Sequence, residues 1–216
     1  MNNGNVTVRP NGSVGQEERR SEKPRLLLHV CCAPDATVGF ERLGQEYDIT
    51  AFFYNPNIHP RAEYELRASE LERLCREMHV PLLAAPYDPE RWFALTRGLE
   101  WEPERGRRCD ICFEMRLDAT AAKAAELGFE YIAAVLTVSP HKLAQRINEI
   151  GLRVAQKYGV TYLPTDLKKK DGFKRSVELS KQFKLYRQDY CGCIYSKRDR
   201  ELWKRRKKAQ EESARR

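Results

Sequence analysis

Six of the seven cysteines in this 216-residue chain come in close pairs, and thiols at such spacings can bind metals or carry out redox chemistry. The pairs are C-C at Cys31 and Cys32, C-x-x-C at Cys109 and Cys112, and C-x-C at Cys191 and Cys193. A carboxylate, Asp35, follows the first pair by three residues. Thiolates are both ligands for soft metals and redox-active groups. Three close pairs beside a carboxylate therefore predict a metal or redox centre.

The spacing of the first two pairs favours an iron–sulfur cluster over structural zinc. Structural zinc sites usually combine two pairs of the C-x2-4-C type, which C-C and C-x-C do not match well. Iron–sulfur clusters are held by cysteine thiolates on irregular loops. The candidate cluster ligands are therefore Cys31, Cys32, Cys109 and Cys112. Structural zinc remains the alternative.

The third pair predicts a redox-active dithiol. A disulfide between Cys191 and Cys193 would close a tight, strained ring, and strained disulfides are the labile and more oxidising ones. Gly192 lies between the two cysteines and supplies backbone freedom. The alternative is that this pair completes a metal ligand set.

The other polar candidates have simpler interpretations. Cys75 has no cysteine neighbour and falls on the apolar face of a predicted helix, so we expect a core residue. Asp35 either caps the first predicted helix or provides an oxygen ligand for a second metal beside the thiolates. We expect His29 to pack against the sheet and His141 to lie at the start of a helix.

The elements that must position these residues alternate between strands and helices. Strand-like apolar runs occupy residues 25–31, 49–55, 80–85, 131–137 and 160–164. Helices are predicted after Pro34, over 60–78 and 109–128, and around Leu143, Ile147, Ile150 and Val154. This alternation predicts an α/β fold with a parallel sheet flanked by helices. Ligands bind beyond the carboxyl ends of the strands of such sheets, and the residues expected there are Cys31, Asn55, Thr137 and Ser139.

Length and composition predict one α/β domain over residues 25–196. Residues 1–24 are polar and lack the apolar segment of a signal peptide, so we interpret them as a disordered leader. Residues 197–216 form a predicted basic helical tail. No apolar run is long enough to span a bilayer. We therefore expect a cytoplasmic protein without a membrane partner, whose thiols stay reduced.

Positive charge gathers near the C-terminus. The net charge is +8, and residues 197–216 contribute +6 of it, with ten Lys or Arg against four Asp or Glu. A second basic run, DLKKKDGFKR, covers residues 166–175. Such stripes attract the phosphate backbones of nucleic acids, although a solvated or solubilising tail is the alternative. Neither a GxGxxG nor a GxxxxGK[ST] motif is present, so no dinucleotide or P-loop site is predicted.

Several long motifs resemble the QueH family of epoxyqueuosine reductases. They are LLLHVCCAP, YNPNIHPRAEYELR, CDICFEMRLDATAAKA, TVSPHK and DLKKKDGFKRSVELSKQFKLYRQDYCGCIYS, and the resemblance runs from about Leu26 to Ser196. It implies a HUP-like α/β fold, similar to adenine nucleotide α-hydrolases. It also implies reduction of epoxyqueuosine to queuosine at the wobble position of tRNA, the last step of queuosine formation.

The resemblance also implies roles for the thiols. It assigns a 4Fe-4S cluster to Cys31, Cys32, Cys109 and Cys112, and a redox-active, catalytic pair to Cys191 and Cys193. Many family members have cysteine where this chain has Asp35. In the others we take the aspartate as a ligand of an additional metal, which we hypothesise to be an iron ion with a catalytic role.

The implied partners are a tRNA that carries epoxyqueuosine and an unidentified electron donor. Aromatic side chains could stack on the flipped base, and the candidates are Phe52, Phe53, Tyr54 and Trp92. A zinc-stabilised RNA-binding module without redox chemistry is the hypothesis from a different class. An iron–sulfur protein would be brown after anaerobic purification, and a zinc protein would be colourless.

Overall fold

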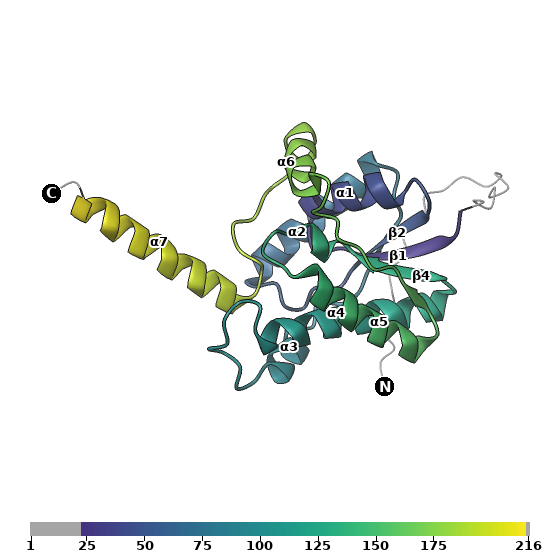
Figure 1. The fold of residues 1–216 in the computed structure, drawn as a ribbon, viewed down its shortest axis with the longest axis horizontal. Coiled ribbons are helices and arrows are strands. Elements are labelled where there is room, and N and C mark those ends of the chain that lie inside the picture. The colour runs from purple at the N-terminus through teal and green to yellow at the C-terminus, as the bar shows by residue number, and fades with distance from the viewer. Residues whose placement is uncertain (1–22, 215–216) are drawn as a thin grey trace.

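A five-stranded parallel sheet is the core of the computed structural model, which describes residues 23–214 (Figure 1). Its strands are β1 (Arg25–His29), β2 (Asp48–Phe53), β3 (Leu82–Ala84), β4 (Tyr131–Ala134) and β5 (Thr161–Tyr162). Their spatial order is β3-β2-β1-β4-β5, and every pairing is parallel. The predicted parallel α/β sheet is confirmed. The leader predicted at residues 1–24 falls almost wholly outside the described residues.

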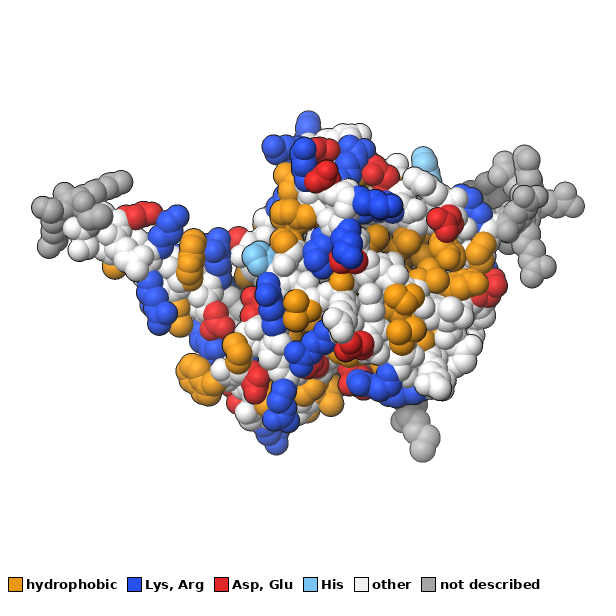
Figure 2. All heavy atoms as spheres, viewed as in Figure 1, with side chains coloured by type: hydrophobic (Ala, Val, Ile, Leu, Met, Phe, Trp, Pro, Cys, Tyr) orange, Lys and Arg blue, Asp and Glu red, His pale blue; other side chains and the backbone are white. Residues whose placement is uncertain are grey.

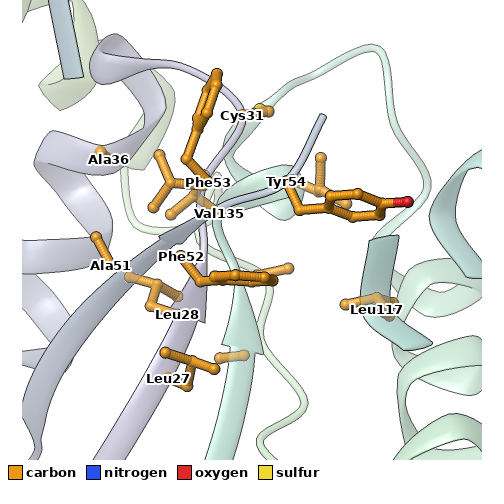
Figure 3. Packing of buried hydrophobic residues seen from close by; sticks show 14 of the residues in the cluster. Leu27, Leu28, Cys31, Ala36, Ala51, Phe52, Phe53, Tyr54, Leu117 and Val135 are labelled. Atoms are coloured by element: carbon orange, nitrogen blue, oxygen red, sulfur yellow. The ribbon is translucent and has the colours of Figure 1, made fainter. Parts of the chain in front are cut away.

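The first strand is central and buried on both faces. Leu26, Leu27 and Leu28 are inaccessible to solvent because β1 pairs with β2 on one side and β4 on the other while helices cover both faces. A continuous apolar run is what such a position requires. Figure 3 shows Leu28 in the same cluster as Phe52 of β2 and Val135, which follows β4.

Helices connect the strands and cover both faces of the sheet. They are α1 (Ala33–Leu43), α2 (Arg61–Glu77), α3 (Pro89–Leu95), α4 (Arg107–Leu127), α5 (Ala144–Tyr158), α6 (Gly172–Gln182) and α7 (Ile194–Ala214). Helix α4 packs on α5, and α1 packs on α6. Figure 1 shows these two helix pairs on opposite sides of the strands.

The fourth strand is shorter than its apolar run predicts. Residues 131–137 were expected to form one strand, but β4 ends at Ala134 and Val135–Val138 form a 3-10 helix, η1. The reason is the partner strand: the β1–β4 pairing ends with His29 opposite Ala134, after which the chain of β1 turns toward α1. Without a ladder partner, the buried backbone of η1 satisfies its polar groups through local 3-10 bonds.

The predicted basic tail is a helix that begins earlier than expected. Helix α7 starts at Ile194, directly after Cys193, and Figure 1 shows it standing out from the rest of the molecule. Residues 201–213 are exposed, and Figure 2 shows Lys and Arg side chains along the helix. Asp189 pairs with Arg200 and Lys204 at its base. No helix among residues 23–214 has the length and apolar character needed to cross a bilayer.

Candidate metal and redox centre

The adjacent cysteines lie where β1 has ended and α1 begins. Cys32 is the N-cap residue of α1, with an extended backbone, and Asp35 lies in the first turn of the helix. The Sγ atoms of Cys31 and Cys32 are 3.9 Å apart. These two sulfurs and a carboxylate oxygen of Asp35 all lie within 4.8 Å of one another, and all three residues are buried. The strand-to-helix turn thus removes the alternation that would point adjacent cysteines to opposite faces.

These three groups shift one another's pKa values. A hydrogen bond with Cys32 lowers the pKa of the Cys31 thiol to about 7. The same hydrogen bond, together with burial, raises the pKa of the Cys32 thiol. Burial also raises the pKa of the Asp35 carboxyl, against the opposing effect of Lys142. The turn can therefore present a thiolate at Cys31 near neutral pH, and metals bind the thiolate form.

The C-x-x-C pair lies on the first turns of α4. Cys109 and Cys112 are three residues apart on one helix and therefore share a face. The Sγ of Cys109 accepts a hydrogen bond of 3.3 Å from the backbone N–H of Arg105. Burial raises the pKa of Cys109 to about 11 and that of Cys112 to about 12. These thiols are protonated near neutral pH, and a bound metal would have to displace their protons.

The C-x-C pair is held on a loop before α7 by buried polar contacts. Gly192 has φ +134°, a conformation that side chains rarely adopt, and its carbonyl accepts a hydrogen bond of 2.8 Å from the backbone N–H of His59. Arg67 of α2 donates to the carbonyls of Cys191, at 3.0 Å, and Tyr190, at 3.3 Å. A Cβ added to Gly192 would lie only 3.1 Å from the Arg67 Nη1 atom. Gly192 therefore has the backbone role that the sequence predicted for it.

The two thiols of this loop differ in access. Cys191 is half-buried and lines a cavity, whereas Cys193 is buried and its Sγ accepts a hydrogen bond of 3.3 Å from the backbone N–H of Ser196. Both are free thiols in this structure. Burial raises the pKa of Cys193. The Cys191 thiol is therefore accessible from the cavity, and the Cys193 thiol is shielded from solvent.

A buried arginine interacts electrostatically with cysteines of all three segments. Arg116 of α4 donates from Nε to the carbonyl of Cys112 at 3.0 Å, but its Nη2 atom has no partner among residues 23–214. Burial lowers the pKa of Arg116, and the thiolate forms of Cys112, Cys31 and Cys191 raise it, with a net upward shift. A buried guanidinium with an unsatisfied donor is stabilised by an anionic neighbour. A metal centre held by several thiolates meets that requirement.

The structure groups the predicted ligands unequally. Within the described part of the chain, the compact set of possible metal ligands consists of Cys31, Cys32 and Asp35. Cys109 and Cys112 lie outside this set. Like Cys31, they interact electrostatically with the Arg116 guanidinium. The donor set is rich in thiolates and carries a balancing buried cation. This chemistry fits a metal cluster.

A cavity of about 490 Å³ opens beside these groups. Its wall includes Cys31, Asp35 and Cys191, together with Lys142 and Arg187. A second cavity of about 20 Å³ lies beside Cys109 and also contacts Cys191 and Lys142. Cys191 and Lys142 therefore contact both cavities, the larger one beside Cys31 and the smaller one beside Cys109. A substrate in the larger cavity could reach a thiol, a carboxylate and an ammonium group.

The structure corrects one set of sequence-based expectations. The four aromatic candidates for base stacking are at most 6% exposed, so their burial contradicts that role: Phe52, Phe53, Tyr54 and Trp92. Figure 3 shows the first three inside the core cluster. Their rings fill the space between the sheet and its helices, where no base can reach them.

The isolated cysteine and the two histidines have mixed outcomes. Cys75 is a buried core residue, as predicted. His29 is buried against the sheet, as predicted, and burial lowers its pKa to about 3. His141 lies in a turn before α5 and lines the cavity, so it does not start the helix.

The polar residues expected beyond the strand ends have separate roles. Ser139 lines the cavity. The amide of Asn55 donates to the carbonyl of Val30 at 2.8 Å, and the hydroxyl of Thr137 lies 2.9 Å from that of Thr165. These last two contacts stabilise the loops that carry the site.

Sequence reasoning missed the three cations around the thiols: Arg67, Arg116 and Lys142. The signal for Arg67 was an arginine on the same helical face as the apolar Leu71 and Leu74, since residues four and seven positions apart share a face. A charged residue on a core-facing stripe usually has a specific buried partner.

Solved structures with a similar fold come from tRNA-modifying proteins. A predicted subunit of tRNA methyltransferase from Methanocaldococcus jannaschii has a TM-score of 0.50 at 13% identity, covering 72% of this chain and 74% of that one. The U34-tRNA thiolase NcsA from Methanococcus maripaludis, solved with its 4Fe-4S cluster, has a TM-score of 0.52 at 13% identity, covering 83% and 64%. The fold class is therefore the HUP-like parallel α/β fold that the resemblance implied.

Sequence relatives define the family within this class. The family model for epoxyqueuosine reductase QueH matches residues 26–199. The chain is 48% identical to epoxyqueuosine reductase QueH of Streptococcus pyogenes serotype M1 (83% of this chain, 72% of the relative) and 42% identical to that of Haemophilus influenzae (83% and 74%). It is 34% identical to that of Thermotoga maritima (88% and 97%). The chain belongs to the epoxyqueuosine reductase QueH family.

Proposed function

We propose that this protein is a cytoplasmic epoxyqueuosine reductase that converts epoxyqueuosine to queuosine at the wobble position of tRNA. The observation that carries the proposal is the placement of Cys31, Asp35 and Cys191 in the wall of one cavity, in a chain of this family. A cavity of about 490 Å³ is large enough for one modified nucleobase, because sites for small ligands typically span about 300–1,000 Å³.

The thiolate-rich donor set would hold a 4Fe-4S cluster. Its ligands would be Cys31, Cys32, Cys109 and Cys112, and the unsatisfied donor of Arg116 supports an anionic group at this position. Asp35, which has a carboxylate oxygen within 4.8 Å of both the Cys31 and Cys32 sulfurs, would ligate an additional iron ion beside the cluster. When bound, the cluster would provide one-electron transfer, with the C-x-C dithiol as the source of the electrons, and the iron would provide a Lewis-acid position.

The C-x-C dithiol matches the electron and proton requirement of the reaction. Removal of the epoxide oxygen as water, with formation of the alkene, consumes two electrons and two protons. Oxidation of the Cys191 and Cys193 thiols to a disulfide releases two electrons and two protons. Cys191 is the member of the pair that lines the cavity. A cellular electron donor then restores the dithiol.

Lys142 is positioned to assist loss of the oxygen. Its side chain lines the cavity and forms no hydrogen bond or ion pair with another residue in the described range. Burial lowers the pKa of this ammonium group, but Cys191, Cys31 and Asp35 raise it, and the net shift is upward. A permanently charged ammonium group can donate a hydrogen bond to the oxygen as negative charge develops on it.

Each of the two basic runs contributes a residue to the wall of the cavity, and the cations of both runs would bind the tRNA backbone. Arg200 of α7 and Phe173 of the 166–175 run both line its wall. Phosphates that contact these runs would bring the anticodon loop to the cavity mouth. Bases in single-stranded loops are free to splay outward into protein pockets.

The proposed function is tested with anaerobically purified, iron-loaded protein. Given a chemical reductant and tRNA that carries epoxyqueuosine, the wild type should convert this nucleoside to queuosine, measured by mass spectrometry of the digested tRNA. Cys193→Ser should keep its iron and lose turnover, and Cys75→Ala serves as a control in the core. A colourless, zinc-containing protein that binds tRNA without converting it would contradict the proposal.

A further inference from the structure

The cavity wall contains an aromatic side chain that is available to a ligand. Phe173 is 37% exposed and lines the same cavity as Cys31 and Cys191. The wall also contains the imidazole of His141 and the ring of Tyr190, and the Tyr190 hydroxyl donates to the carbonyl of His59 at 2.6 Å. Phe173 is thus the six-membered aromatic ring of the described wall that has an exposed surface and no polar group that must keep a hydrogen bond.

The backbone before α6 fixes the position of Phe173. Gly172 packs so closely that an added Cβ would lie 1.7 Å from the carbonyl oxygen of Leu167. Arg42 of α1 donates to the carbonyls of Leu167, at 3.0 Å, and Lys169, at 2.9 Å. These hydrogen bonds therefore fix the turn before Phe173 to α1. Helix α1 itself begins directly after Cys32.

A planar cation is held beside this ring. Arg187 donates from Nη1 to the hydroxyl of Ser180 at 2.9 Å and to the carbonyl of Ser176 at 3.3 Å. Both serines are buried on α6. The guanidinium carbon lies 5.6 Å from the centre of the Phe173 ring, and Arg187 also lines the cavity. Its Nε and Nη2 donors make no hydrogen bond to any residue that the structure describes.

We propose that Phe173 and Arg187 form the platform on which the modified wobble base stacks; this inference rests on the proposed function. The reacting epoxide lies on the cyclopentane substituent, so the flat base must occupy a different part of the cavity from the thiols. Proteins that bind bases from single-stranded RNA stack them on aromatic rings and Arg guanidinium planes. Phe173 and Arg187 provide one surface of each kind next to the reactive groups.

The test compares two anticodon stem-loop RNAs, one with epoxyqueuosine and one with an abasic nucleotide at the wobble position. Phe173→Leu should weaken binding of the epoxyqueuosine RNA about 5- to 100-fold, the range expected when one base stack is removed. Phe173→Trp should restore this affinity. The abasic RNA should bind wild type and Phe173→Leu equally, because it has no base to stack.

The matched control is Phe93→Leu, since Phe93 is 40% exposed and lines a different surface depression. Phe93→Leu should leave the affinity for the epoxyqueuosine RNA and for the abasic RNA unchanged. Equal weakening of both RNAs by Phe173→Leu, or no weakening of either, would overturn the platform. Turnover of the wild type is measured separately: failure to reduce epoxyqueuosine, with base-dependent loss of affinity in Phe173→Leu, would refute the proposed function and leave the platform standing.

Discussion

The turn between β1 and α1 brings the side chains of two adjacent cysteines to the same side of the backbone. Cys31 follows the end of β1 and Cys32 is the N-cap of α1, so both sulfurs reach the side on which Asp35 lies. The sequence signals for this turn were an apolar run, a Pro at the second position of the helix and an acidic residue in its first turn. The proximity of Arg116 could not be predicted, because it depends on the packing of α4 against the sheet.

Metal content tests the residue roles. Cys109→Ala should lose most of the iron and acid-labile sulfide of the wild type, because one iron of the cluster would lose its thiolate. Cys75→Ala is the matched control, since Cys75 is also a helical cysteine but is buried in the core. It should retain the wild-type content. Full iron and sulfide in Cys109→Ala would remove Cys109 from the ligand set.

Measuring the metal content of Asp35→Ala distinguishes the additional iron from the cluster. This variant should keep the visible absorption of the cluster and lose about one metal ion per chain, because Asp35 would ligate the additional iron and not the cluster. Unchanged metal content would make Asp35 an acidic residue that only stabilises the helix N-terminus.

The elements were predicted well where an apolar pattern alone decides them. The central strand and α4, which ends before Gly128 in the left-handed conformation, follow from the pattern and from a helix stop signal. The prediction omitted α3 and α6, although Asp88 and Pro89 form a recognisable start for α3. The early end of β4 depends on where its partner strand turns away. That is a tertiary constraint, which the sequence of β4 does not contain.

Helix α7 allows a prediction about a whole element. Replacing the basic residues of segment 204–208 by Gln should weaken tRNA binding and flatten its salt dependence, by roughly 0.7–0.9 in the log–log slope for each phosphate that the helix no longer neutralises. Binding is measured over a salt series, and iron content should not change.

The acidic residues of the same helix provide the control. Glu211→Gln and Glu212→Gln alter charge on α7 without removing a cation, so they should not weaken binding. An unchanged slope after removal of the five basic side chains would make α7 a solubilising extension rather than an RNA-binding helix.

Across the whole molecule, the fold collects thiols from distant segments at one edge of the sheet. Three segments contribute these thiols: the turn after β1, the start of α4 and the loop before α7. Arg116 interacts electrostatically with cysteines of all three, and the first and last of them line one cavity. A parallel sheet places its ligand site at the carboxyl ends of its strands, which the sequence predicted. The position of the C-x-C loop at this edge could not be predicted, because it depends on hydrogen bonds from Arg67 of α2 and from the backbone N–H of His59.

A single-turnover experiment tests whether the C-x-C dithiol reduces the epoxide. Iron-loaded protein is reduced to the dithiol, freed of reductant and mixed with tRNA that carries epoxyqueuosine. The queuosine formed and the disulfide between Cys191 and Cys193 are then both quantified by mass spectrometry. We expect one disulfide for each queuosine formed, and neither product in Cys191→Ser. Formation of queuosine with both thiols still reduced, or by Cys191→Ser at the wild-type rate, would contradict this mechanism.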